Sequence, residues 1–96
     1  MTKNKRSIED IKEILSTHLE EIREKHGVKE IGILEFYRGE KEEDSYVEIV
    51  VDFERPAGFF KFFKLEDFLK ELLGIKVELT TRNVLKQDEL KRVINL

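Results

Sequence analysis

Residues 46–53 carry the pattern that most restricts the fold of this chain. The segment Tyr-Val-Glu-Ile-Val-Val-Asp-Phe alternates strictly, and a period of two is typical of a β-strand with one buried face. We therefore expect one sheet face to be packed and the other to be available for a site. The apolar side is Val47, Ile49, Val51 and Phe53, and the mixed side is Tyr46, Glu48, Val50 and Asp52.

Helical periodicity precedes and follows this strand. Apolar residues at spacings of three and four predict one helix over residues 7–26, with Ser7 and Asp10 at its start and Gly27 at its end. The same spacing predicts a second helix over 58–73 and a last helix over 87–94. The second helix contains five phenylalanines, and we expect these rings to pack in the core.

Two more strands complete the predicted sheet. The strand at 28–37 leads into a polar connection at 38–45, which we expect to form a plain hairpin with residues 46–53. In the strand at 75–81, Lys76, Glu78 and Thr80 alternate with Ile75, Val77 and Leu79. A right-handed crossover through the second helix makes the last two strands parallel. The predicted fold class is α+β: a small mixed sheet of three to four strands with helices packed on one face.

Composition limits the function classes. The 96 residues suit one domain over residues 1–96, with a polar tail at 1–6. Eighteen basic and twenty-one acidic residues give a net charge of −3, which argues against a nucleic-acid binder. No apolar run is long enough to span a membrane and there is no cysteine, so we expect a cytoplasmic protein. The many Glu and Lys residues predict a thermostable protein, natural or designed.

The order of elements and several local motifs resemble the minimal nucleotidyltransferases, the antitoxin-type branch of the polymerase-beta-like superfamily. The resemblance covers residues 8–94 and implies a nucleotidyltransferase-like fold. The motifs that carry it are Val28-Lys29-Glu30-Ile31-Gly32-Ile33, Arg38-Gly39-Glu40, Asp44-Ser45 with the strand that follows, Phe59-Phe60-Lys61-Phe62, Leu72-Leu73-Gly74-Ile75-Lys76-Val77 and Val84-Leu85-Lys86.

The chain departs from the functional motifs that this resemblance implies. The family has a Gly-Ser turn after its first strand, where this chain has Leu34-Glu35-Phe36-Tyr37. Tyr46 stands in place of the first aspartate of an Asp-x-Asp pair, and Glu48 in place of the second. Glu78 stands in place of a third carboxylate, whereas Arg38, Gly39 and Ser45 are unchanged. Whether residues 34–45 form a plain hairpin or keep the family's short helix stays open.

These departures lead to three hypotheses. The leading one is a catalytically inactive scaffold, a pseudoenzyme or a designed protein, without metal or cofactor, as a monomer or small homo-oligomer. The alternative is a magnesium-dependent transferase of adenylyl groups from ATP, with Glu48 and Glu78 as catalytic carboxylates and Arg38 and Ser45 as nucleotide ligands. The resemblance then implies a helical ribonuclease toxin as the partner.

The third hypothesis is a protein-interaction module, which predicts an exposed apolar patch rimmed by polar residues. The same residues also have simpler interpretations. Glu48 and Glu78 are then solvated surface glutamates, and Arg38 is a solvated turn residue. His18 and His26 stand eight apart, which is not the spacing of a helical metal site.

Overall fold

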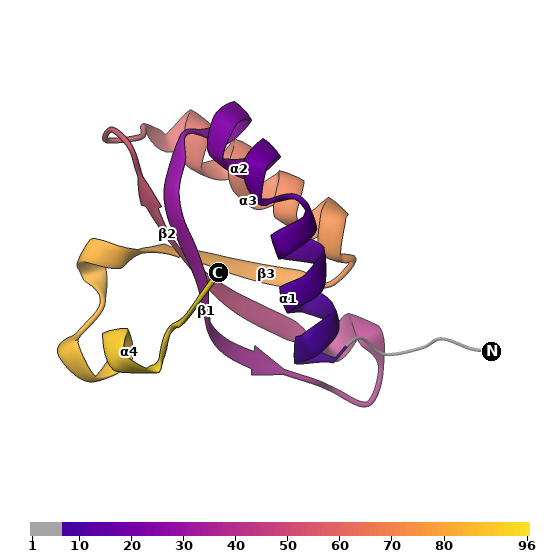
Figure 1. The fold of residues 1–96 in the computed structure, drawn as a ribbon. Coiled ribbons are helices and arrows are strands. Elements are labelled where there is room, and N and C mark those ends of the chain that lie inside the picture. Colours follow the sequence, from indigo (N-terminus) through magenta and orange to yellow (C-terminus); the bar gives the residue numbers. More distant parts are fainter. Residues whose placement is uncertain (1–6) are drawn as a thin grey trace.

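A four-stranded mixed sheet forms one layer of the molecule, and α1, α2 and α3 lie together on one of its faces (Figure 1). The computed structural model describes residues 7–96, so the tail expected at 1–6 lies outside the described residues. The strand order is β3-β2-β1-β4. The elements are α1 (Ile8–Thr17), α2 (Leu19–His26), β1 (Val28–Tyr37), η1 (Glu42–Asp44), β2 (Tyr46–Phe53), α3 (Phe59–Leu73), β3 (Lys76–Thr81), η2 (Arg82–Val84), α4 (Gln87–Arg92) and β4 (Ile94–Asn95).

The predicted pairing of the strands is confirmed. β1 and β2 are antiparallel and stay paired as far as Tyr37 and Tyr46, so they form a hairpin with one 3₁₀ turn in its connection. β2 and β3 are parallel, joined by the crossover through α3. The structure thus confirms the α+β fold class with a mixed sheet of four strands.

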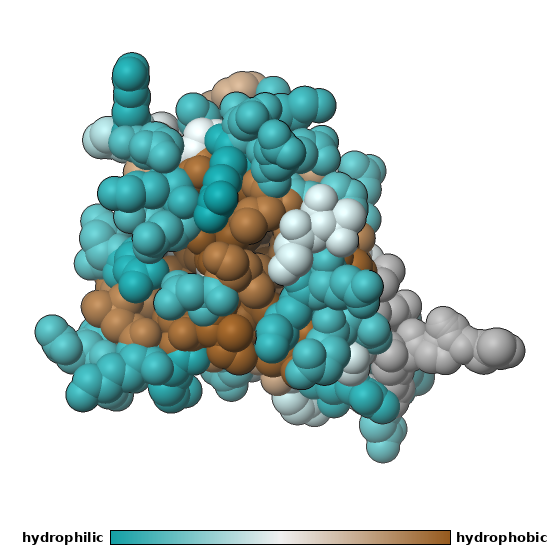
Figure 2. Space-filling view, viewed as in Figure 1, coloured by the Kyte–Doolittle hydropathy of each residue, from teal (hydrophilic) through white to brown (hydrophobic). Residues whose placement is uncertain are grey.

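The core lies between the sheet and the first three helices. Alternate residues of β2 point into it, and α3 contributes residues at helical spacing that are fully buried. Figure 2 shows apolar surface in the middle of the molecule with hydrophilic side chains around it. The fully buried residues of these two elements include Val47, Ile49, Leu65, Leu69 and Leu73.

Two helices stand where the sequence predicted one. The helix over 7–26 is interrupted at His18, which has φ −102° and ψ 13° and separates α1 from α2. The Thr17 hydroxyl donates to the Glu13 carbonyl, and the His18 ring bonds to the Ile14 carbonyl. Side chains that bond back to the preceding turn compete with the helix hydrogen bonds and favour a bend.

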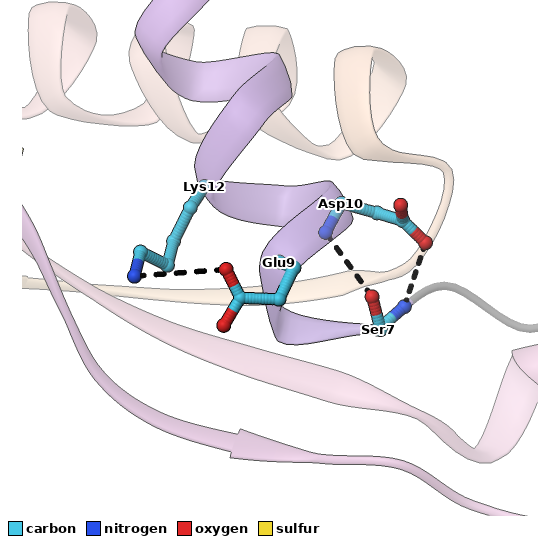
Figure 3. Close-up of polar contacts among 4 residues, drawn as sticks. All are labelled: Ser7, Glu9, Asp10 and Lys12. Carbon is cyan, nitrogen blue, oxygen red and sulfur yellow. Dashed lines mark hydrogen bonds and ion pairs between the residues drawn. The ribbon is translucent and has the colours of Figure 1, made fainter.

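The predicted start and stop of this helical region are confirmed. Ser7 Oγ accepts a hydrogen bond from the Asp10 amide at 3.2 Å, and the Asp10 carboxylate accepts one from the Ser7 amide at 3.0 Å (Figure 3). Figure 3 also shows the ion pair of Lys12 with Glu9, which lies in the same first turn of α1. Gly27 ends α2 with φ 66°, in the left-handed region that glycine adopts most easily.

The prediction of a helix over 87–94 was wrong in its last part. α4 ends at Arg92, and Ile94–Asn95 form β4, which pairs with Gly32 and Ile33 of β1. Glycine permits this close approach, because a Cβ at Gly32 would lie 2.6 Å from a methyl group of Val93. Ile94 and Asn95 therefore pair with the edge of β1, although the apolar spacing up to Ile94 also fits a helix.

The expectation that all five phenylalanines of α3 pack in the core was wrong. Phe62 and Phe68 pack against the core, whereas Phe59, Phe60 and Phe63 are 82%, 81% and 52% exposed. A helix on a sheet buries one stripe, and these three rings lie outside that stripe. We call these three residues the phenylalanine patch.

The helices give no sign of a membrane span. Over residues 7–96, no helix is both long and apolar enough to cross a bilayer.

Candidate functional site

Three glutamates form a row across neighbouring strands on the sheet face opposite α1–α3, which we call the open face. The backbone register pairs Glu35 of β1 with Glu48 of β2, and Glu48 with Glu78 of β3. Neighbouring strands lie about 4.8 Å apart, so the row spans about 10 Å. The structure therefore brings together Glu48 and Glu78, the two carboxylates that the sequence singled out.

A β-bulge in β1 brings the third carboxylate to this row. Ile33 is paired with Ile49 and Glu35 with the next residue, Glu48, so Leu34 is the extra residue. Leu34 packs with Val50 on the open face, and Glu35 follows it there because the bulge interrupts the alternation. Glu35 was not among the site residues predicted from the sequence, since alternation alone does not reveal a bulge.

The environment of Glu48 disfavours its charged form. Partial burial, followed by the charge of Glu78, raises the pKa of Glu48 above its usual value. The hydroxyl of Thr80 donates a hydrogen bond to Glu48 Oε2 at 3.4 Å, which acts in the opposite direction. Glu35 and Glu89 of α4 add further repulsion. A bound cation would relieve this repulsion.

Two stacked tyrosines lie directly beside the carboxylate row. The ring centroids of Tyr37 and Tyr46 are 5.6 Å apart, with 25° between the ring planes. The charge of Glu35, followed by partial burial, raises the pKa of Tyr46, so its phenol stays protonated at neutral pH. Tyr46, at the position of the family's first aspartate, is therefore a neutral aromatic side chain.

The two predicted nucleotide ligands lie in the connection between β1 and β2. Arg38 is exposed, directly after β1. Ser45 is buried, and its hydroxyl accepts a hydrogen bond from the Gly39 amide at 3.0 Å and donates to the Lys41 carbonyl at 3.3 Å. Ser45 thus stabilises the connection, and its nucleotide contact stays a prediction.

The donor set of the open face fits Mg²⁺ only together with a substrate. Among the side chains that the structure describes, which exclude those of residues 1–6 and 42, no group of three His, Asp or Glu is arranged to hold a metal ion. Mg²⁺ in proteins is usually bound through one or two carboxylates plus substrate phosphates and water. Glu48 and Glu78 supply two such carboxylates, and neither takes part in the ion pairs of the described residues.

A second hollow lies on the helical side, between α2 and α3. Charged side chains of both signs line this open groove around His26 and Phe68, whose ring centroids are 4.8 Å apart. Burial, followed by the charge of Lys64, lowers the pKa of His26. The groove has no dominant charge and no reactive group beyond this histidine, so the open face is the better candidate site.

The comparison with known proteins finds relatives over most of this chain. The protein adenylyltransferase MntA of Thermococcus cleftensis is 45% identical over 89 residues, covering 92% of this chain and 90% of that protein. Two Methanocaldococcus jannaschii proteins provisionally named protein adenylyltransferases, MJ1215 and MJ0128, are 44% and 41% identical, covering 81% and 93% of this chain. No family model matches the chain, and no solved structure matches it significantly.

These relatives identify the chain as a minimal nucleotidyltransferase with the α+β fold described above. The chain belongs to the family of MntA-like protein adenylyltransferases.

The hypothesis of an inactive or designed scaffold was wrong. Natural relatives at more than 40% identity over most of the chain are named adenylyltransferases, so neither a pseudoenzyme nor a designed origin is supported. The error was to infer an inactive protein from shortened or replaced motif residues alone, and the names of the relatives overturn that inference. Carboxylates persist at two positions in register, and a bulge adds a third beside them.

Proposed function

We propose that this protein transfers the adenylyl group of ATP to a hydroxyl group of a protein substrate, with Mg²⁺ bound together with the nucleotide. The row of Glu35, Glu48 and Glu78 carries the proposal, because phosphoryl chemistry at a sheet face needs carboxylates that gather a divalent cation. The names of the relatives support the same reaction class.

The residues take distinct roles in this proposal. Glu48, which accepts the hydrogen bond from Thr80, holds the cation together with the nucleotide phosphates. Glu78 is exposed at the outer end of the row and accepts the proton of the attacking hydroxyl. The hydroxyl oxygen attacks the α-phosphorus of ATP, and pyrophosphate leaves. When bound, Mg²⁺ supplies positive charge that stabilises the phosphate oxygens.

An adenylyl-transfer assay with labelled ATP tests this proposal. The substitutions Glu48→Gln and Glu78→Gln keep side-chain size and remove the charge, and we expect each to reduce transfer by about 10²- to 10³-fold. The matched control is Glu24→Gln, an exposed glutamate of α2. Residue-resolved NMR with Mg²⁺ and ATP should show shifts at Glu48 and Glu78. Full activity of Glu48→Gln would contradict the proposal.

The phenylalanine patch favours a second function, the binding of a protein partner. Phe59 and Phe63 stack with ring centroids 6.2 Å apart, and the Lys64 ammonium lies 5.9 Å from the centroid of Phe60. The charges of Lys61 and Lys64 both lower the pKa of His26, so positive charges gather near the N-terminal part of α3 in a protein that is acidic as a whole. We propose that the patch contacts an apolar surface edged by carboxylates on a protein partner, and the helical toxin implied by the family resemblance is the candidate.

A designed peptide tests this surface without a known partner. The probe is an amphipathic helix with leucine on one face and glutamate on the other, and the same helix with lysine is its control. The acidic peptide should shift the NMR signals of α3 and lose affinity when Phe59, Phe60 and Phe63 are replaced by serine. Val84→Ser, at another exposed apolar residue, should have no effect. Equal binding of both peptides would contradict the proposal.

A further inference from the structure

A second row of side chains runs beside the carboxylates on the open face. The register places Tyr37 opposite Tyr46, and Tyr46 opposite Lys76. Because side chains two residues apart share a sheet face, this row lies next to Glu35, Glu48 and Glu78. The open face thus combines two aromatic rings, the ammonium group of Lys76 and three carboxylates within a few strand spacings.

The aromatic pair is accessible to a ligand. Tyr37 is 52% exposed, although it is stacked with Tyr46, and Lys76 at the other end of the row is also exposed. Lys76 takes part in none of the ion pairs of the described residues.

The chemistry of this row is complementary to a nucleotide. A neutral aromatic ring stacks on the face of a nucleobase, and such stacking tolerates any base. An ammonium group attracts phosphate as a mobile point charge. A nucleotide with its phosphates near Glu48, Glu78 and a cation would lie beside both kinds of group.

We propose that Tyr37, held by Tyr46, is the stacking platform for the nucleobase, and that Lys76 contacts the phosphates of the same nucleotide. The proposal rests on the proposed adenylyltransferase function and adds a nucleotide subsite to it. Tyr46 supports the ring of Tyr37 from β2, so it is a positioning residue.

Two probes separate the base from the phosphates: Mg²⁺-ATP and Mg²⁺-triphosphate without a base. We expect Tyr37→Leu to weaken ATP binding by about tenfold and to leave triphosphate binding unchanged, because only ATP loses a stacking partner. Tyr37→Phe keeps the aromatic face and should bind ATP as the unmodified protein does. Lys76→Gln should weaken both probes by a similar factor.

The outcomes distinguish the platform from the reaction. If Tyr37→Leu binds ATP normally while Glu48→Gln loses transfer, the platform is wrong and the proposed function stands. If Tyr37→Leu weakens both probes equally, the side chain acts through the fold and the platform is also wrong. If the unmodified protein binds neither probe at millimolar concentration, both proposals fail. Circular dichroism of each variant checks that the exposed substitution leaves the fold intact.

Discussion

The two faces of the sheet differ in what they contain. The covered face, under α1–α3, is lined by aliphatic residues with little or no exposure. The open face has only a small apolar cluster of Leu34, Val50 and Val93 with Leu85, and next to it the carboxylate row. Because hydrophobic burial supplies most folding free energy, the covered face can stabilise the fold while the open face tolerates repulsion between like charges.

The largest loss of stability is expected from a substitution in the core under the covered face. Leu69 of α3 is fully buried, and Leu69→Ala should lower the free energy of unfolding by about 2–5 kcal/mol through lost burial and a cavity. Urea unfolding measures the change. The neighbouring exposed Lys70→Ala should stay within about 0.5 kcal/mol. Similar losses for both variants would show that α3 does not pack as described.

A smaller effect is expected from the apolar cluster of the open face. Val93 is 9% exposed and packs with Leu34 and Val50, so Val93→Ala should cost about 1.5 kcal/mol for two buried methyl groups. The same unfolding experiment applies, with the exposed Val84→Ala as its control. If Val93→Ala lowered the free energy of unfolding as much as Leu69→Ala does, the two faces would contribute equally to stability and the comparison would be wrong.

The carboxylate row gives the open face its own pH dependence. The pKa of Glu48 is raised in the folded state, so protonation favours folding and this contribution is lost as pH rises above 4.5 through the folded pKa. Glu48→Gln should therefore gain stability relative to the unmodified protein as pH rises, by less than about 1 kcal/mol because solvent screens the site. Thermal melts from pH 4 to 7 measure the stability of both proteins. A stability difference that does not change with pH would contradict the repulsion at Glu48.

His26, on the helical side, should make stability depend on pH in the direction opposite to Glu48, and this is the smallest of the expected effects. Its pKa is lowered in the folded state, so its contribution to stability is present above 6.5 and is lost as pH falls below that value through the folded pKa. His26→Gln should lose this dependence in melts from pH 5 to 8. The partly buried His18 ring bonds to the Ile14 carbonyl in the last turn of α1, and His18→Gln serves as the comparison.

Local patterns in the sequence predicted most of the fold. Alternation at Val47, Ile49 and Val51 fixed the strand and its buried face, and Ser7 and Gly27 marked the helix ends. The break at His18 was missed because the apolar spacing continues across it. The pairing of Ile94 was missed because it depends on Gly32, which is distant in the sequence.

The candidate site could be predicted only in part. Glu48 and Glu78 followed from alternation and parallel pairing, and the structure places them in register. Glu35 and Tyr37 required knowledge of the bulge and of the cross-strand partner, which no local pattern encodes. The exposed rings of Phe59, Phe60 and Phe63 were assigned to the core because helical spacing does not show how wide a stripe the sheet can cover.

The short strand β4 has a consequence for how copies of this protein meet one another. It occupies the outer edge of β1 at Gly32 and Ile33, and the amide of Leu96 donates to the Ile31 carbonyl. An unoccupied strand edge is a template on which a second chain can add its own strand and start a growing fibril. Because residues 94–96 already pair with the middle of β1, a strand of a second chain cannot add to the sheet at this position.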